Sequence, residues 1–292
     1  MRYLLILLPF ALLLSCHTTP QQDWPAESLT TKPWTRWWWM GNAVDDANIR
    51  KQLIAYHEAG LGGVEITPIY GAMGFEEQYI DHLSKDWMDR LQTVIRVADS
   101  LGMGVDMNLG TGWPYGGPQI TPEYAASKMI VQQYTLKAGQ ALKEKITVND
   151  EKQAAMHPKL ATLMAYRPES TIDLTDSLNE NGFLQWVPDA NYELYAIFAG
   201  KTGQMVKRAA PGGAGLVMDH LNKESFPVYT ARFGEAFGTP GPNIRSFFND
   251  SYEVYGANFT PTLFDAFERN RGYDLKPYLP TLLSTDSSAT VR

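Results

Sequence analysis

The most constraining feature of the sequence is an alternation of strand-like and helix-like segments in its first hundred residues. Residues 34–40 form a continuous apolar and aromatic run, and short apolar runs at 63–67 and 104–109 follow it. Continuous runs of this kind are typical of strands buried on both faces of a parallel sheet. Between them, residues 45–60 and 84–102 place apolar side chains at helical spacing. The repetition predicts an α/β fold with parallel crossovers.

Helix boundaries are marked by capping residues. Asp45 and Asp46 precede the first helical pattern and Ser84 precedes the second, and their side-chain oxygens can accept hydrogen bonds from the first free N–H groups of a helix. Gly60 and Gly102 close the same two patterns, as expected of helix ends.

Polar residues are predicted at the carboxyl ends of successive strands, which favours a barrel over a nucleotide-binding sheet. The sequence has no glycine fingerprint at the start of the first helix and no phosphate-binding loop with a lysine. Barrels carry their active sites at the carboxyl ends of the strands. The residues expected there are Asn42, Glu65, Asn108 with Trp113, and Asp250 with Glu253. We therefore predict a partial (β/α)8 TIM-type barrel, containing only the first strands.

The chain divides into five expected parts. Residues 1–15 are an export signal, 16–33 a linker, and 34–128 the first half of the catalytic barrel. Residues 129–202 lose helical periodicity and alternate between apolar and polar, which predicts an inserted antiparallel β-rich segment. Residues 203–292 are expected to continue the barrel. Because only four or five barrel strands can be counted, the chain is expected to be a fragment, truncated at its C-terminus.

The N-terminus predicts the cellular compartment. Met1 and Arg2 precede an apolar stretch that ends at Cys16, a pattern similar to a bacterial lipoprotein signal. The alternative is an ordinary secretory peptide. Cys16 is the only cysteine of the chain, so no intramolecular disulfide and no cysteine metal cluster can form. We expect an exported protein, lipid-anchored through Cys16 in the bacterial envelope, in the periplasm or on the cell surface.

Charge and aromatic content narrow the partners. The chain has 25 basic and 32 acidic residues, and this net charge of −7 disfavours nucleic acid. Aromatic residues make up 12%, with eight tryptophans. Most aromatic rings pack in cores, but this number also suggests surfaces for stacking on sugars.

Glu253 is the candidate general acid. Residues 247–254 run from apolar side chains into carboxylates, like a buried strand that ends at an active-site rim. Cleaving a glycosidic bond needs a protonated carboxyl group and a second carboxylate, about 6.5–9.5 Å apart in inverting enzymes. Phe248, Tyr252 and Tyr255 are expected to raise the pKa of Glu253 by desolvation. The alternatives are a helix cap, a salt bridge or a solvated turn. The base is expected outside this chain, with Asp250 or Asp219 next in line.

Several further residues are candidates for substrate binding. Glu65 and Asn108 offer oxygen ligands for sugar hydroxyls or a hard cation, and Trp113 lies in a glycine-rich loop suited to stacking on a pyranose. Asp219 with His220 follows another short strand. Asn42 and Asp250 complete the set. The alternative for each is an ordinary packed or hydrogen-bonded residue of the fold.

Six short strings in order resemble glycoside hydrolase family 106, the α-L-rhamnosidases. The strings are WWWMGN at 37–42, LGGVEI at 61–66, GTGWPYGGP at 110–118, VMDH at 217–220, FNDSYE at 248–253 and RGYDL at 271–275. The resemblance implies a large, multi-domain exported enzyme with a (β/α)8 catalytic domain, an inverting mechanism and calcium at the sugar site. It also implies terminal rhamnose on plant or bacterial oligo- or polysaccharides as substrate. The metal ligands are unknown.

Two other functions remain open. One is a different barrel glycosidase, and the other is a non-catalytic, lipid-anchored glycan-binding protein in which Glu253 has no role. Because this sequence is shorter than the family pattern, its later barrel strands are missing. We expect it to be inactive in isolation.

Overall fold

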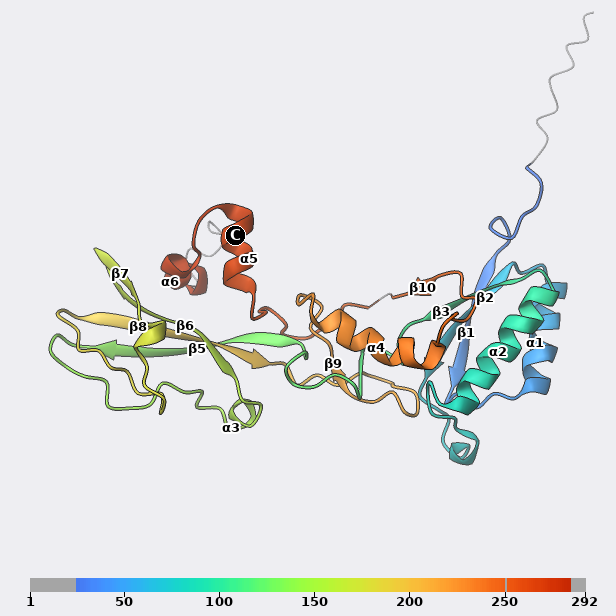
Figure 1. The fold of residues 1–292 in the computed structure, drawn as a ribbon, viewed down its shortest axis with the longest axis horizontal. Coiled ribbons are helices and arrows are strands. Elements are labelled where there is room, and N and C mark those ends of the chain that lie inside the picture. Colours follow the sequence, from blue (N-terminus) through green and yellow to red (C-terminus); the bar gives the residue numbers. More distant parts are fainter. Residues whose placement is uncertain (1–24, 250, 285–292) are drawn as a thin grey trace, which may run out of the picture.

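The computed structural model describes residues 25–249 and 251–284, so the predictions for Cys16 and Asp250 lie outside the described residues. The molecule is elongated, with a parallel sheet at one end and an antiparallel sheet at the other (Figure 1). Across the described ranges, no helix combines the length and apolar character needed to cross a membrane.

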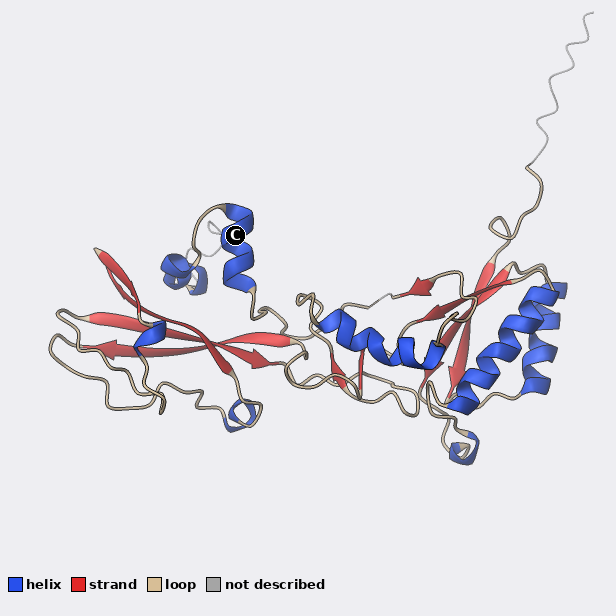
Figure 2. Cartoon of the chain, in the orientation of Figure 1, coloured by secondary structure: helices blue, strands red, loops and turns tan. Residues whose placement is uncertain are grey.

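The parallel sheet contains four strands whose spatial order follows the chain. These are β1 (Trp34–Met40), β2 (Gly63–Ile69), β3 (Gly104–Asn108) and β10 (Phe247–Phe248), in the order β1-β2-β3-β10. Helices α1 (Asp46–Glu58) and α2 (Lys85–Ser100) lie side by side on one face of the sheet (Figure 2). A 3-10 turn, η1 (Glu76–Gln78), precedes α2. The predicted strand–helix alternation is confirmed.

Both predicted caps are present. The Asp45 carboxylate accepts from the backbone N–H of Asn48 at 2.9 Å, and the Ser84 hydroxyl accepts from that of Trp87 at 3.3 Å. Trp87 is fully buried, with its ring 5.7 Å from that of Trp39 on β1. Large apolar side chains buried in this way stabilise a fold by about 1.5–3 kcal/mol each, so the contact between Trp87 and Trp39 helps to hold α2 on the sheet.

The opposite face of the parallel sheet is polar and aromatic. Trp37 and Trp39 point into the core beneath the helices, so the alternate residues Arg36 and Trp38 point to the other face. There Arg36 pairs with Glu65 at 3.0 Å, and Trp38 is 47% exposed. Other polar side chains on this face are buried, so it is exposed mainly around Trp38.

A β-rich insertion separates β3 from the helix that leads to β10. Strand β4 (Gly116–Gly117) pairs with β9 (Leu216–Val217). Between them lie β5 (Ser127–Leu136), β6 (Lys159–Arg167), β7 (Ser170–Asp173) and β8 (Tyr192–Lys201), in the antiparallel order β5-β8-β6-β7. The short α3 (Glu151–Ala154) and η2 (Thr175–Ser177) connect these strands. Helix α4 (Ser225–Phe237) then returns to β10. The antiparallel structure is confirmed, and the domain boundaries stay predictions.

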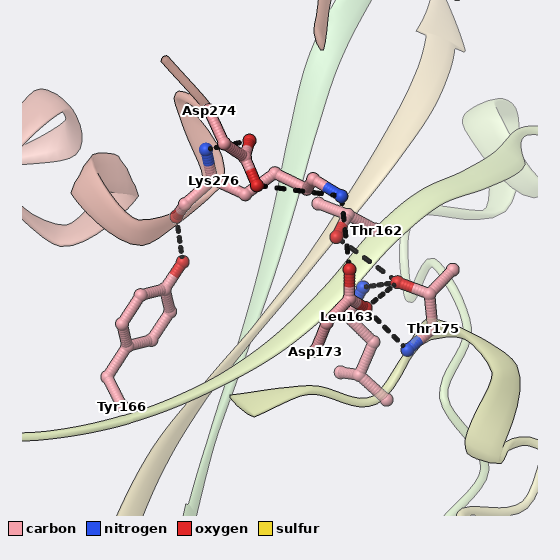
Figure 3. A network of polar contacts seen from close by, with 7 residues as sticks. All are labelled: Thr162, Leu163, Tyr166, Asp173, Thr175, Asp274 and Lys276. Carbon is pink, nitrogen blue, oxygen red and sulfur yellow. Dashed lines mark hydrogen bonds and ion pairs between the residues drawn. The ribbon is translucent and has the colours of Figure 1, made fainter. Parts of the chain in front are cut away.

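The last helices pack on the antiparallel sheet. Phe264 of α5 (Leu263–Arg271) and Leu279 of α6 (Leu279–Leu283) share a core cluster with Tyr166 and Ile197. The turn η3 (Lys276–Tyr278) is tied to the sheet by Lys276 (Figure 3). These helices therefore lie beside the insertion, whereas residues 203–292 were expected to continue the barrel.

Figure 3 shows how that turn is held. The Lys276 ammonium lies 3.1 Å from the Asp173 carboxylate at the end of β7. The hydroxyl of Thr175 donates to the same carboxylate at 2.6 Å and accepts from the backbone N–H of Leu163 at 3.0 Å. Tyr166 donates to the backbone oxygen of Lys276. Polar contacts thus complement the apolar cluster beneath α5.

The buried strand expected within residues 247–254 is wrong in length. β10 contains only Phe247 and Phe248, which pair with Met107 and Asn108. The partner strand β3 ends at Asn108, so later residues have no ladder to join. Phe247 is accordingly half exposed and not part of a long buried strand.

Candidate active site

The glycine-rich loop after β3 is clamped against residues 205–218. The backbone N–H of Trp113 donates to the oxygen of Lys207 at 3.1 Å, and the N–H of Lys207 donates back at 2.7 Å. The N–H of Ala210 donates to the oxygen of Thr111 at 2.9 Å. The loop is therefore part of a two-stranded structure, which fixes Trp113 beside Lys207.

A pocket of about 350 Å³ lies at this junction, lined by Trp113, Lys207, Arg208, Ser251 and Glu253. The indole of Trp113 is half-buried, and its ring centre lies 5.8 Å from that of Trp38, on the sheet face opposite the helices. The pocket thus brings together two residues predicted from the sequence, the candidate acid and the candidate stacking platform.

Glu253 is held by its neighbours but is exposed. The Tyr255 hydroxyl donates to Oε2 of Glu253 at 3.3 Å, and the side chain of Gln204 donates to the Glu253 backbone oxygen at 2.7 Å. The expectation that aromatic neighbours bury the carboxylate is wrong, since Tyr252 is 71% and Tyr255 56% exposed. Because β10 stops at Phe248, residues 251–255 run over the surface as a loop.

Asn42 and Asn108 lie outside the pocket and are buried. The Asn42 side chain donates to the backbone oxygen of Ile80 at 2.9 Å. Asn108 accepts from the N–H of Gly110 at 3.0 Å, which shapes the start of the glycine-rich loop. In this structure both asparagines hold the loops that leave the sheet.

Glu65 does not end a strand, in contrast to the prediction. It is the third residue of β2, which continues to Ile69 in register with Met40. Pro68 is tolerated there because β3 pairs with β2 only as far as Ile66, so the missing N–H of the proline costs no hydrogen bond. The Glu65 carboxylate accepts from Arg36 at 3.0 Å and from Thr67 at 3.2 Å.

Asp219 and His220 form a turn after β9 and do not line the pocket. The buried Asp219 carboxylate accepts from the N–H of Leu221 at 2.9 Å and from the Thr260 hydroxyl at 3.0 Å. His220 Nδ1 lies 3.0 Å from the oxygen of Met218, and burial lowers the pKa of this ring. The turn therefore joins the end of the insertion to the segment before α5.

The described residues contain no cluster of acidic, histidine or cysteine side chains that marks a metal site. Within residues 25–249 and 251–284, no group of three or more His, Cys, Asp or Glu side chains lies close enough to hold a metal ion. Glu65 and Asp106, on neighbouring strands, are each paired with an arginine instead. Calcium at the sugar site thus stays a prediction.

Sequence reasoning missed Lys207, Arg208 and Ser251, all of which line the pocket. A Lys–Arg pair in a loop ordinarily marks a solvated surface, so no local pattern singles it out. Its position depends on backbone pairing with Trp113, a contact between residues far apart in sequence.

Comparisons with known proteins agree with this architecture. A protein of Formosa agariphila named "Putative beta-glucuronidase" is 27% identical over 88% of this chain and 26% of its own length. The structure of a rhamnosidase from Novosphingobium sp. PP1Y matches with a TM-score of 0.68 at 16% identity, over 87% of this chain and 42% of that one, which shows a shared fold. This chain thus spans about a quarter of the first protein and less than half of the second.

The family model described as alpha-L-rhamnosidase matches residues 24–150 and 143–287, which together make up most of the sequence. Six sequence strings and a mixed α/β fold fit that match. The chain belongs to glycoside hydrolase family 106.

Proposed function

We propose that this chain is part of an inverting α-L-rhamnosidase and that Glu253 is its general acid. The observation that carries the proposal is that Glu253 and Trp113 line one pocket. Membership in a glycoside hydrolase family described as alpha-L-rhamnosidase supports the reaction class. The pocket is formed by the loop that follows β3, on the side where parallel α/β folds carry their sites.

The geometry suits proton donation to a leaving oxygen. A carboxyl group on an exposed loop can reach a glycosidic oxygen at the pocket mouth, while the half-buried indole of Trp113 offers an apolar surface to the sugar ring. The hydrogen bond from Tyr255 to Oε2 orients the carboxyl group. Asp219 is buried and hydrogen-bonded away from the pocket, so we propose that the base comes from another part of the full-length protein.

We also propose that the parallel sheet forms the first strands of a (β/α)8 barrel. Its strands follow one another in chain order with no reversal, unlike a doubly wound sheet, which changes direction at a switch point. Export and lipid attachment at Cys16 remain proposals, supported by the sequence of residues 1–16.

Replacing Glu253 by Gln in the full-length protein tests the acid assignment. Two substrates are compared, an aryl α-L-rhamnoside whose phenol leaves readily and one whose phenol needs protonation. We expect kcat/KM to fall by about 10²–10⁴ on the second substrate and much less on the first. Glu235→Gln, an exposed glutamate on α4, is the matched control. Equal losses on both substrates, or no loss, would remove Glu253 from this role.

Product analysis separates the alternative functions. Another glycosidase would release galactose, or glucuronic acid as the name of the Formosa protein suggests, instead of rhamnose. A glycan-binding protein would release no sugar, and Glu253→Gln would leave its binding unchanged. We expect residues 16–292 alone to release no rhamnose, and detectable release would contradict that expectation.

A further inference from the structure

Two exposed cations, Lys207 and Arg208, line the pocket beside Glu253. Within the two described stretches, neither makes an ion pair with a carboxylate. Other cations of this chain do, as Arg245 pairs with Asp106 and Lys276 with Asp173 at 3.1 Å. The described residues that line the pocket therefore include two cations, with Glu253 as the one carboxylate among them.

Aromatic residues hold both cations without neutralising them. The Lys207 ammonium donates to the Tyr255 hydroxyl at 2.9 Å and lies 4.3 Å from the centre of that ring. The Arg208 guanidinium donates to the Tyr70 hydroxyl at 2.9 Å and lies 5.2 Å from its ring centre. An ammonium has three donors and a guanidinium five, so both groups keep donors for a ligand.

The backbone fixes where these cations lie. Lys207 exchanges two backbone hydrogen bonds with Trp113, and the oxygen of Arg208 accepts from the N–H of Tyr70 at 2.9 Å. Arg208 has a φ of +58°, a conformation that residues other than glycine rarely adopt. Such conformations persist only where surrounding contacts impose them, and they gather at ligand sites.

Among the described residues that line the pocket, two positive charges stand against one carboxylate, although the whole chain has a net charge of −7. A rhamnosyl group is neutral and needs no cation. An arginine fork and a lysine suit a carboxylate or a sulfate, both of which accept several charge-assisted hydrogen bonds. The nearby Trp113 and Trp38 offer stacking surface for the sugar that bears such a group.

We propose that this pocket selects anionic glycans, with Lys207 and Arg208 binding a uronate carboxylate or a sulfate ester on the sugar next to the rhamnose that is released. The inference rests on the proposed function of Glu253, because it assigns the charge of the neighbouring sugar in the same site.

The test uses the full-length protein and four matched substrates. Rhamnose is linked to glucuronic acid, to the methyl ester of glucuronic acid, to glucose 6-sulfate or to glucose. The measured quantity is kcat/KM for each anionic substrate divided by that for its neutral partner. We expect this ratio to be about 10 or more in the wild type and to drop about tenfold in Lys207→Met and in Arg208→Met. Lys51→Met, an exposed lysine on α1, removes the same charge and should keep the ratio.

The arms of the experiment separate the outcomes. A high ratio for only the uronate or only the sulfate identifies the group. A wild-type ratio near one, with rhamnose released from the neutral substrates, overturns the inference and leaves the proposed function standing. Raising the salt concentration should lower the wild-type ratio, a measurement that needs no variant.

If no substrate releases rhamnose, the proposed function fails. Binding of the anionic disaccharides, measured by calorimetry, then tests the roles of Lys207 and Arg208. Glucuronic acid and glucose 6-sulfate disaccharides should then bind the wild type at least tenfold more tightly than Lys207→Met. Equal binding would overturn the assignment of these two residues.

Discussion

Replacing Gly112 by Ala should show how much the backbone pairing between Trp113 and Lys207 contributes to stability, apart from the cost of a positive φ. Gly112 has a φ of +133°, and a Cβ added there would overlap the backbone oxygen of Lys207 and lie 3.0 Å from the carbonyl carbon of Arg208. Gly139 is the matched control, because its φ is +73° and an added Cβ would meet no atom within 4 Å. The two variants share an unfavourable φ and differ in the overlap.

The magnitude follows from that difference. A φ of +73° costs a residue with a side chain about 1–2 kcal/mol, and a φ of +133°, which is essentially restricted to glycine, costs at least as much. In Gly112→Ala the Lys207 backbone must also move, which weakens two hydrogen bonds to Trp113 worth about 1 kcal/mol each. In a domain of about 150–250 residues that unfolds cooperatively, an additional loss of about 2 kcal/mol corresponds to a melting temperature about 4–8 °C below that of Gly139→Ala.

Two measurements on the full-length protein check this prediction. Thermal unfolding of the two variants gives the difference in melting temperature. Hydrogen exchange read by mass spectrometry reports on residues 205–218, whose protection should fall in Gly112→Ala and not in Gly139→Ala. Equal melting temperatures with unchanged protection of that segment would refute the claim that pairing with Lys207 stabilises the loop around Trp113.

Two further predictions concern pH. Burial, and then the charge of Arg232, lowers the pKa of His82 to about 3, so protonation opposes folding. The contribution of His82 to stability should therefore be level above pH 6.5 and fall by about 1.4 kcal/mol per pH unit from there to about pH 3, so melting curves should show a slope steeper by that amount in the wild type than in His82→Met. Burial raises the pKa of Asp173, but hydrogen bonds from Thr175 and then Lys276 outweigh it and lower that pKa. The ion pair thus stabilises the fold above pH 3.8, and this stabilisation is lost as the pH falls through the folded pKa of Asp173. The protection of α5 against hydrogen exchange should therefore change less between pH 6 and 3 in Lys276→Met than in the wild type.

Local chemistry made much of the fold predictable. Asp45 and Ser84 cap the helices they were expected to cap, because capping depends on residues within one turn. The alternation after Met129 correctly indicated antiparallel strands for the same reason. Strand ends were less predictable, since β10 stops where its partner β3 stops and β2 extends as far as β1 allows.

The candidate site was predictable only in part. Trp113 and Glu253 carry chemistry recognisable by type, and the structure places both at one pocket. Lys207 and Arg208 reach the same pocket through pairing with the glycine-rich loop, and such distant contacts leave no mark in a local pattern. Glu65 was wrongly predicted at the end of a strand, because a short apolar run does not show at which residue the strand ends.

The insertion has a consequence for the order of folding. β10 joins the parallel sheet beside β3, where Phe247 pairs with Met107, so a long stretch of chain must be looped out before the two strands meet. The first residue of β5, Ser127, pairs with the last residue of β8, Lys201, so the antiparallel sheet brings its own ends together. Once it has formed, the segment that must be looped out is much shorter, and the entropic cost of closing it is lower. The entropic cost of folding is thus lower if the antiparallel sheet forms before β10 completes the parallel sheet.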